Sequence, residues 1–119
     1  MKRNLGVVVL LSFVALVALF SAARAGDTAA GTPDPKAIFL AQKCNLCHSL
    51  AAASTERTMK SSKAPDLSGV GLERDAAWIE KFITKKEKLN GKDHQKMFTG
   101  SEAELKALAE WLAGMKQKP

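Results

Sequence analysis

The chain has 119 residues, of which 46% are hydrophobic and 25% are charged, and its formal net charge is +6. A chain of this length predicts a single domain and excludes a large multidomain enzyme. Three of its 18 basic side chains lie in the first 25 residues, so the remainder carries 15 basic and 12 acidic groups, an excess too small to indicate nucleic-acid binding.

The N-terminal segment has the pattern of a secretory signal. Lys2 and Arg3 make a basic start, residues 5–23 are apolar and uncharged, and small residues precede Gly26. This pattern predicts a signal peptide at residues 1–25, cleavage before Gly26 and a periplasmic protein. The alternative is an uncleaved membrane anchor, but the apolar run is only marginally long enough to span a membrane. We therefore expect removal of the signal and no stable membrane insertion afterwards.

Residues 26–33 are mostly small and polar, and they predict a flexible tail before a domain at residues 34–119. Asp34 followed by Pro35 predicts a helix start, because aspartate caps a helix N-terminus and proline is tolerated in the first helical position. The apolar run at residues 38–41 gives this helix a side that can be buried. We expect the helix to run into the cysteine motif that follows it.

The motif Cys44-Asn45-Leu46-Cys47-His48 has the spacing of a covalent attachment site for one haem c. Each thiol can add to a vinyl group of the porphyrin, and the histidine can bind the iron. Three other interpretations are a thioredoxin-like redox pair, a plain disulfide, and a zinc site completed by His94. No βαβ pattern supports the redox pair, and His94 lies far along the chain for a zinc ligand. Haem is therefore the favoured cofactor.

A ligating histidine needs a partner for its second ring nitrogen. Residues 49–63 have no clear period and predict a loop beside the cofactor, and Pro65 follows in a turn segment that ends at Gly71. Pro65 offers a carbonyl group and no competing N–H, so it is a candidate to orient His48. The other interpretation is that Pro65 only forms the turn.

A second helix is predicted from Asp75, its N-cap, to about Leu89, and Asn90-Gly91 is expected to end it. One face of this helix is apolar and predicts core residues: Trp78, Ile79, Phe82 and Ile83. The opposite face is basic: Lys81, Lys85, Lys86 and Lys88. Such a face is either simply solvated or a docking site for an acidic redox partner.

The last helix is predicted to open with a capping box at Ser101 to Glu104, after an irregular segment at residues 92–100. Its apolar stripe follows helical spacing: Leu105, Leu108, Ala109, Leu112 and Met115. No segment of the chain has the pattern of a strand. The sequence therefore predicts an all-α fold with three main helices.

Taken together, these features resemble a class I monohaem cytochrome c from Asp34 to about Lys116. The resemblance is carried by the haem motif, Pro65 to Gly71, Trp78 to Ile83 and the capped last helix. It implies a small cytochrome c fold around one covalent haem, with the first and last helices packed across each other and the carbonyl of Pro65 bonded to His48. One departure is that Leu40 stands where the family has an aromatic residue, and Phe39 lies one position away.

The sequence leaves two candidates for the sixth iron ligand, His94 and Met97. In the family it is usually a methionine, roughly sixteen to eighteen residues before the aromatic residue of the last helix. Counted back from Trp111, His94 is 17 residues away and Met97 is 14. Met59 stands too early in the chain, and Met115 belongs to the apolar stripe. Spacing favours His94 and the family's habit favours Met97; of the two, we favour His94.

The resemblance implies a periplasmic carrier of single electrons between other redox proteins, and not an enzyme. The sequence shows no nucleophile with a positioned base and no paired acid and base carboxylates. The alternative is a haem protein with a labile sixth ligand, either peroxidase-like or a gas sensor. An optical spectrum separates the two, because a carrier should be six-coordinate and low-spin.

Overall fold

The computed structural model describes residue 31 and residues 33–118. The predicted signal peptide, its cleavage site and most of the predicted tail therefore lie outside the described residues. The elements in chain order are α2 (Pro35–Ala41), three short 3₁₀ turns (Cys44–Leu46, Ala51–Ala53 and Val70–Leu72), α3 (Ala76–Ile83) and α4 (Glu102–Ala113). The described part of the chain contains three α-helices and no strand, so the all-α prediction is confirmed. None of its helices has the length and apolar character needed to cross a membrane.

Helix α2 begins as predicted and ends earlier than predicted. The backbone N–H of Lys36 donates to the Asp34 carboxylate at 3.1 Å, and Pro35 takes the first helical position. The helix ends at Ala41, because Lys43 adopts a left-handed backbone conformation with φ +57° that no α-helix continues through. The expectation of a helix running into the cysteine motif is therefore wrong. The first cysteine lies on a separate 3₁₀ turn, and the second is its C-cap.

Helix α3 also begins as predicted, with the Asp75 carboxylate accepting from the backbone N–H of Trp78 at 2.8 Å. The predicted end near Leu89 is wrong, because the helix stops at Ile83. The hydroxyl of Thr84 donates to the carbonyl of Glu80 at 2.6 Å, which satisfies one of the last carbonyls of the helix. Lys85 then turns left-handed with φ +59° and takes the chain out of the helix.

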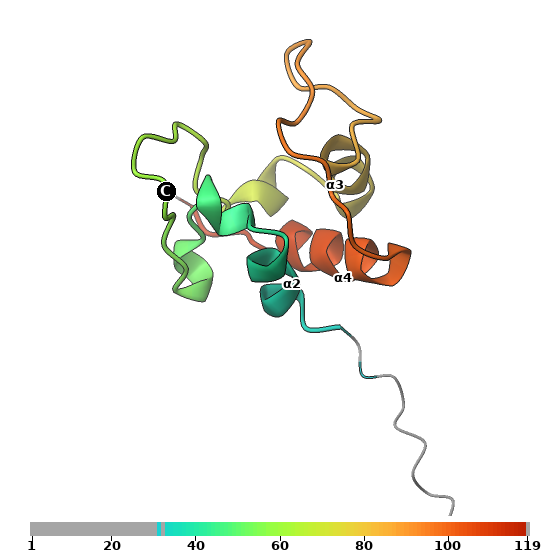
Figure 1. The fold of residues 1–119 in the computed structure, drawn as a ribbon, viewed down its shortest axis with the longest axis horizontal. Helices are drawn as coiled ribbons and strands as arrows, with labels where there is room; N and C mark the ends of the chain where they lie inside the picture. The colour runs from blue at the N-terminus through green and yellow to red at the C-terminus, as the bar shows by residue number, and fades with distance from the viewer. Residues whose placement is uncertain (1–30, 32, 119) are drawn as a thin grey trace, which may run out of the picture. The chain divides into compact units, whose positions relative to one another are not determined.

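The Asn90-Gly91 pair makes a tight turn and does not end a helix. Leu89 and Lys92 exchange two backbone hydrogen bonds of 2.9 and 3.0 Å across the pair. Both residues of the pair have positive φ, +51° for Asn90 and +74° for Gly91, as a two-residue hairpin turn requires. The segment between α3 and α4 is consequently a long looped connection, which Figure 1 shows.

Helix α4 opens on the predicted capping box. The Ser101 hydroxyl accepts from the backbone N–H of Glu104 at 3.2 Å, and the Glu104 carboxylate accepts from the N–H of Ser101 at 2.7 Å. Two acidic residues in the first turn, Glu102 and Glu104, also suit the positive end of the helix dipole. Helix α4 contacts both α2 and α3, and Figure 1 shows it beside α2 and below α3.

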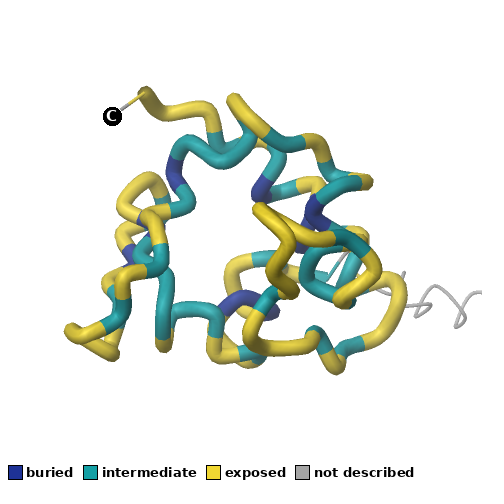
Figure 2. The backbone as a smooth tube through the Cα atoms, turned by 90° about the horizontal axis from the view of Figure 1, so that it is seen from above, coloured by how far each residue is buried: buried dark blue, intermediate teal, exposed yellow. Residues whose placement is uncertain are grey.

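The core forms where these helices meet, and it is small. Its buried hydrophobic residues are Ile38, Phe39, Leu50, Ile79, Leu108, Ala109 and Leu112. Figure 2 marks the buried positions along the chain in dark blue. Phe39 is completely buried and meets Trp111 edge to face, with ring centres 6.2 Å apart, whereas Leu40 is 43% exposed. Phe39 thus makes the predicted crossing of the first and last helices, although it is displaced from the family's aromatic position.

Two backbone hydrogen bonds fasten the segment after Pro65 to the residues that follow α4. The N–H of Gly71 donates to the carbonyl of Met115 at 2.8 Å, and the N–H of Gln117 donates to the carbonyl of Ser68 at 2.9 Å. A Cβ at Gly71 would overlap the carbonyl oxygen of Ala113. Glycine is needed here because the two backbones approach this closely.

Candidate haem site

The fold brings the rings of the two histidines of the chain close to each other. His48 follows the 3₁₀ turn of the cysteine motif, and His94 lies in the long connection between α3 and α4. Their rings are nearly parallel, with 8° between the planes and 6.2 Å between the ring centres. A bond between a metal and an imidazole nitrogen is about 2 Å long, so a metal held between two such nitrogens places the ring centres about 6 Å apart.

His48 is oriented by the contact that the resemblance predicted. Its Nδ1 lies 2.8 Å from the carbonyl oxygen of Pro65. Because a carbonyl can only accept, Nδ1 carries the hydrogen, and the lone pair of the neutral ring is on Nε2. Burial is the largest effect on the His48 imidazole and lowers its pKa. The hydrogen bond to Pro65 opposes this, and the neighbouring His94 lowers the pKa further. The ring is therefore neutral at neutral pH, as a metal ligand must be.

Arg57 holds the loop that supplies the Pro65 carbonyl. Its Nη1 donates to the carbonyl oxygens of Ser62 at 2.6 Å and Ala64 at 3.0 Å. The Ser62 hydroxyl donates in turn to the carbonyl of Cys47 at 3.0 Å. The residues just before Pro65 are thus tied both to each other and to the cysteine motif. This arrangement fixes the orientation of His48 through its hydrogen-bond partner.

The ring of His94 is held in the same way as that of His48, by a hydrogen bond to a backbone carbonyl. Its Nδ1 donates to the carbonyl oxygen of Lys96, which leaves Nε2 as the free acceptor. The ring of Phe82 packs against it at 71°, with the centres 5.2 Å apart, and Phe82 stacks in turn on Trp78 at 4.7 Å. Met97, the other candidate, is 52% exposed. The structure therefore places His94 opposite His48 and leaves Met97 at the surface.

The cysteines stand as two free thiols, both half-buried. Burial raises the pKa of Cys44 to about 11, although the positive charge of Lys96 opposes this, so the unreacted thiol is protonated at neutral pH. Within residues 33–118, no group of three or more histidine, cysteine, aspartate or glutamate side chains is gathered as a metal-binding cluster. The set of two thiols and two parallel imidazoles with free Nε2 atoms fits a thioether-bonded haem.

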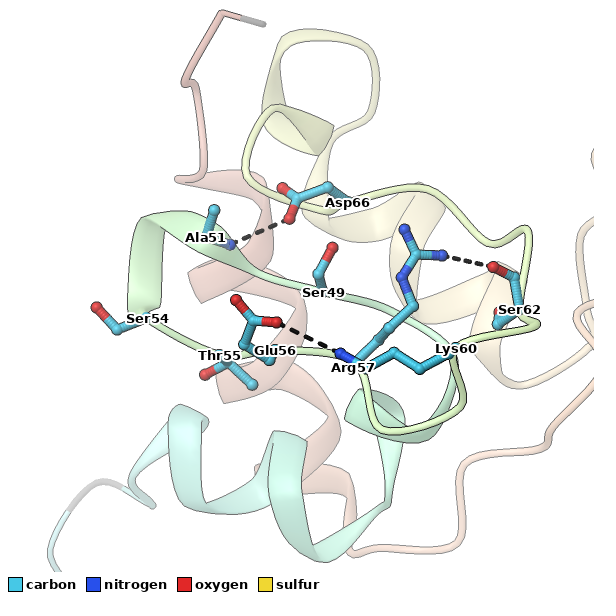
Figure 3. Close-up of a pocket in the computed structure, with 9 residues that line it drawn as sticks. All are labelled: Ser49, Ala51, Ser54, Thr55, Glu56, Arg57, Lys60, Ser62 and Asp66. Atoms are coloured by element: carbon cyan, nitrogen blue, oxygen red, sulfur yellow. Dashed lines mark hydrogen bonds and ion pairs between the residues drawn. The ribbon is translucent and has the colours of Figure 1, made fainter.

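An open pocket of about 600 Å³ lies beside the loop that ends at Pro65, and it contains neither histidine and neither cysteine (Figure 3). Asp66 lines it and accepts from the backbone N–H groups of Ala51 at 3.1 Å and Ser68 at 2.8 Å. Burial alone would raise the pKa of Asp66, but hydrogen bonds from Ser68, Ser49 and Ala51 outweigh this and hold the pKa at about 2. Asp66 thus fastens the residues that follow Pro65 to the turn at Ala51–Ala53.

A family model described as Cytochrome c matches residues 34–116, well over half of the chain. The chain belongs to the cytochrome c family. Family membership means that this cytochrome carries covalently bound haem c, with which the free pair Cys44 and Cys47 agrees, and that its chemistry is haem-based electron transfer. Neither the comparison with curated proteins nor the comparison with solved structures found a match.

Sequence reasoning missed the residues that support the two histidines of this cytochrome. Arg57 and Lys96 count only as charges in a sequence, and Phe82 counts only as a core residue. Their roles depend on which backbone carbonyls lie nearby, and no spacing rule predicts that. Only Pro65 could be found in advance, through its place in the family motif.

Proposed function

We propose that this cytochrome carries single electrons with a haem bonded to Cys44 and Cys47 and held between His48 and His94. The bound haem supplies the one-electron exchange between Fe(III) and Fe(II). The observation that supports the proposal is the pair of parallel imidazoles, each with its Nδ1 bonded to a backbone carbonyl and its Nε2 free. Such bonding fixes the tautomer and the direction of a ligand before the metal is present.

The two histidines would hold a bound haem iron in the same surroundings in both oxidation states. Each ring is held by a hydrogen bond, and His94 is also packed against Phe82, so neither needs to move when the electron arrives or leaves. This favours a carrier over the alternative of a labile sixth ligand for peroxidase-like or gas-sensing chemistry. A second imidazole also implies a lower reduction potential than a methionine thioether would.

We propose that an acidic redox protein docks on the basic residues at the end of α3 and on the connection that carries His94. Lys81, Lys85, Lys86 and Lys88 are all exposed. The single ion pair among the described residues joins Lys60 to Glu56, so these lysines are not neutralised by a neighbouring carboxylate. Because α3 ends at Ile83, Lys81 lies on the helix and the other three lie on the connection that carries His94. Three of the four charges therefore belong to the connection that carries His94, and not to one helix face as predicted.

We propose also that the protein works in the periplasm, after removal of residues 1–25. The support is the basic start, the apolar run and the small residues before Gly26 in the sequence. Mass spectrometry of the protein from its native host tests this. A mature N-terminus at Gly26 with the added mass of one haem is expected, and a retained N-terminal segment would contradict the proposal.

The ligand assignment is tested by optical spectra of His94→Ala and Met97→Ala in both oxidation states. We expect the unmodified protein and Met97→Ala to share a six-coordinate low-spin spectrum. His94→Ala should turn high-spin in at least one oxidation state, and its ferrous form should bind carbon monoxide readily. The opposite pattern, with Met97→Ala losing the low-spin spectrum and His94→Ala keeping it, would assign the ligand to Met97.

A further inference from the structure

Three hydrogen bonds from the His94 segment converge on one residue at the end of α2. The Nζ of Lys96 donates to the main-chain carbonyl of Gln42 at 2.6 Å. The side-chain oxygen of Gln42 accepts from the backbone N–H of Thr99 at 3.2 Å and from its hydroxyl at 3.3 Å. We call these three bonds the Gln42 latch. It joins the connection between α3 and α4 to the helix that leads into the haem motif.

The position of Gln42 suits this role. It is the C-cap of α2, where the last carbonyls of a helix lack partners within the helix and carry its negative dipole end. A lysine ammonium is a favourable partner for such a carbonyl, because the bond is charge-assisted. The latch is therefore stronger than a contact between two neutral surface groups.

Lys96 connects the latch to the sixth ligand. Its side chain is fixed on α2, and its own main-chain carbonyl accepts the hydrogen of His94 Nδ1. His94 and Lys96 are two residues apart on the connection between α3 and α4, where no helix holds the backbone in place. Fixing the side chain of Lys96 thus fixes the carbonyl that directs Nε2 of His94.

We propose that Lys96, held by Gln42, is the positioning residue that keeps His94 on the iron. This inference rests on the proposed ligation by His94. An exogenous ligand can bind only while His94 is displaced, so its apparent binding rate reports the fraction of molecules with an open site. Loosening the latch should raise that fraction without changing the ligand set.

Lys92 supplies the matched control. It lies on the same connection and is exposed, and its side chain makes no hydrogen bond or ion pair within residues 33–118. Lys92→Met and Lys96→Met remove the same charge from the same segment. Of the two, only Lys96→Met removes a bond of the latch, the one from Lys96 to the Gln42 carbonyl. Lys96→Arg retains a donor that can reach this carbonyl.

The experiment is carbon monoxide binding to the ferrous holoprotein, followed by stopped flow for the unmodified protein and these three variants. Carbon monoxide is neutral, so a lost lysine charge does not alter its attraction to the site. Loss of one charge-assisted hydrogen bond should speed binding about threefold to tenfold in Lys96→Met. Lys92→Met should match the unmodified protein, and Lys96→Arg should recover most of the effect. Melting temperatures identify any variant that is generally destabilised.

The outcomes separate the two proposals. Equal binding rates for Lys96→Met and Lys92→Met would overturn the latch, provided that His94→Ala still loses the low-spin spectrum. If His94→Ala keeps that spectrum, the proposed ligation has failed first. A faster rate in Lys96→Met that Lys96→Arg does not reverse would also count against the latch, because the donor would then be irrelevant.

Discussion

At the scale of single residues, the site depends on backbone carbonyls placed opposite histidine nitrogens. Pro65 and Lys96 contribute only a carbonyl oxygen to His48 and His94. The side chains that hold these carbonyls in place are charged: Arg57 on one side and Lys96 itself on the other. Charged surface residues thus act on the iron site through the positions of main-chain atoms.

Asp66 gives a prediction with a defined pH dependence. Its pKa is lowered from the usual 3.8 to about 2 in the folded chain, so its carboxylate stabilises the fold above pH 3.8 and this contribution disappears as the pH falls towards 2. Asp66→Asn should lower the melting temperature of the holoprotein near neutral pH, and the difference should shrink between pH 4 and pH 2. A difference that stays constant over this range would show that the charge of Asp66 does not matter.

At the residue level, the sequence supports a prediction where a motif sets a distance. The spacing of the cysteine motif indicates the attachment site, and the offset of 17 positions from His94 to Trp111 favours the histidine whose ring lies parallel to that of His48. Lys96 could not be found this way. Its role depends on the carbonyl of Gln42, far away in sequence, and a bond between them has no sequence signature.

At the scale of elements, helix starts were predictable and helix ends were not. Asp34, Asp75 and Ser101 cap their helices through local side-chain bonds that are visible in the sequence. The ends of α2 and α3 depend on left-handed conformations at Lys43 and Lys85. Lysine has no particular preference for that conformation, so tertiary contacts must impose it and the sequence does not reveal it.

The contact between the Gly69–Gly71 segment and α4 leads to a stability prediction. Gly71→Ala introduces a Cβ that overlaps the Ala113 carbonyl, and two backbones must then separate. We expect a loss of about 1–3 kcal/mol in the free energy of unfolding, measured by guanidinium denaturation of the holoprotein. Gly31→Ala is the control, because a Cβ there has no neighbour within 4 Å. Equal stability of the two variants would show that this packing is not tight.

At the scale of the whole molecule, the exposed lysines around the His94 connection should attract anions. We expect the oxidation of the ferrous protein by ferricyanide to slow as ionic strength rises. The double variant Lys85→Gln/Lys86→Gln should show a weaker salt dependence than the unmodified protein. The control is Lys106→Gln/Lys116→Gln, which removes the same charge from exposed sites on and just after α4 and should have a smaller effect. Equal effects of the two pairs would show that only net charge matters and that this region is no docking site.

The proposed position of one covalent haem between two parallel imidazoles is tested most directly by low-temperature electron paramagnetic resonance of the ferric holoprotein. Two axial imidazoles with parallel planes give a rhombic low-spin spectrum, and the 8° between the His48 and His94 rings predicts that result. A high-spin signal would mean that the sixth position is open. A low-spin signal accompanied by the red charge-transfer band of a methionine-ligated haem would mean that Met97, and not His94, binds the iron.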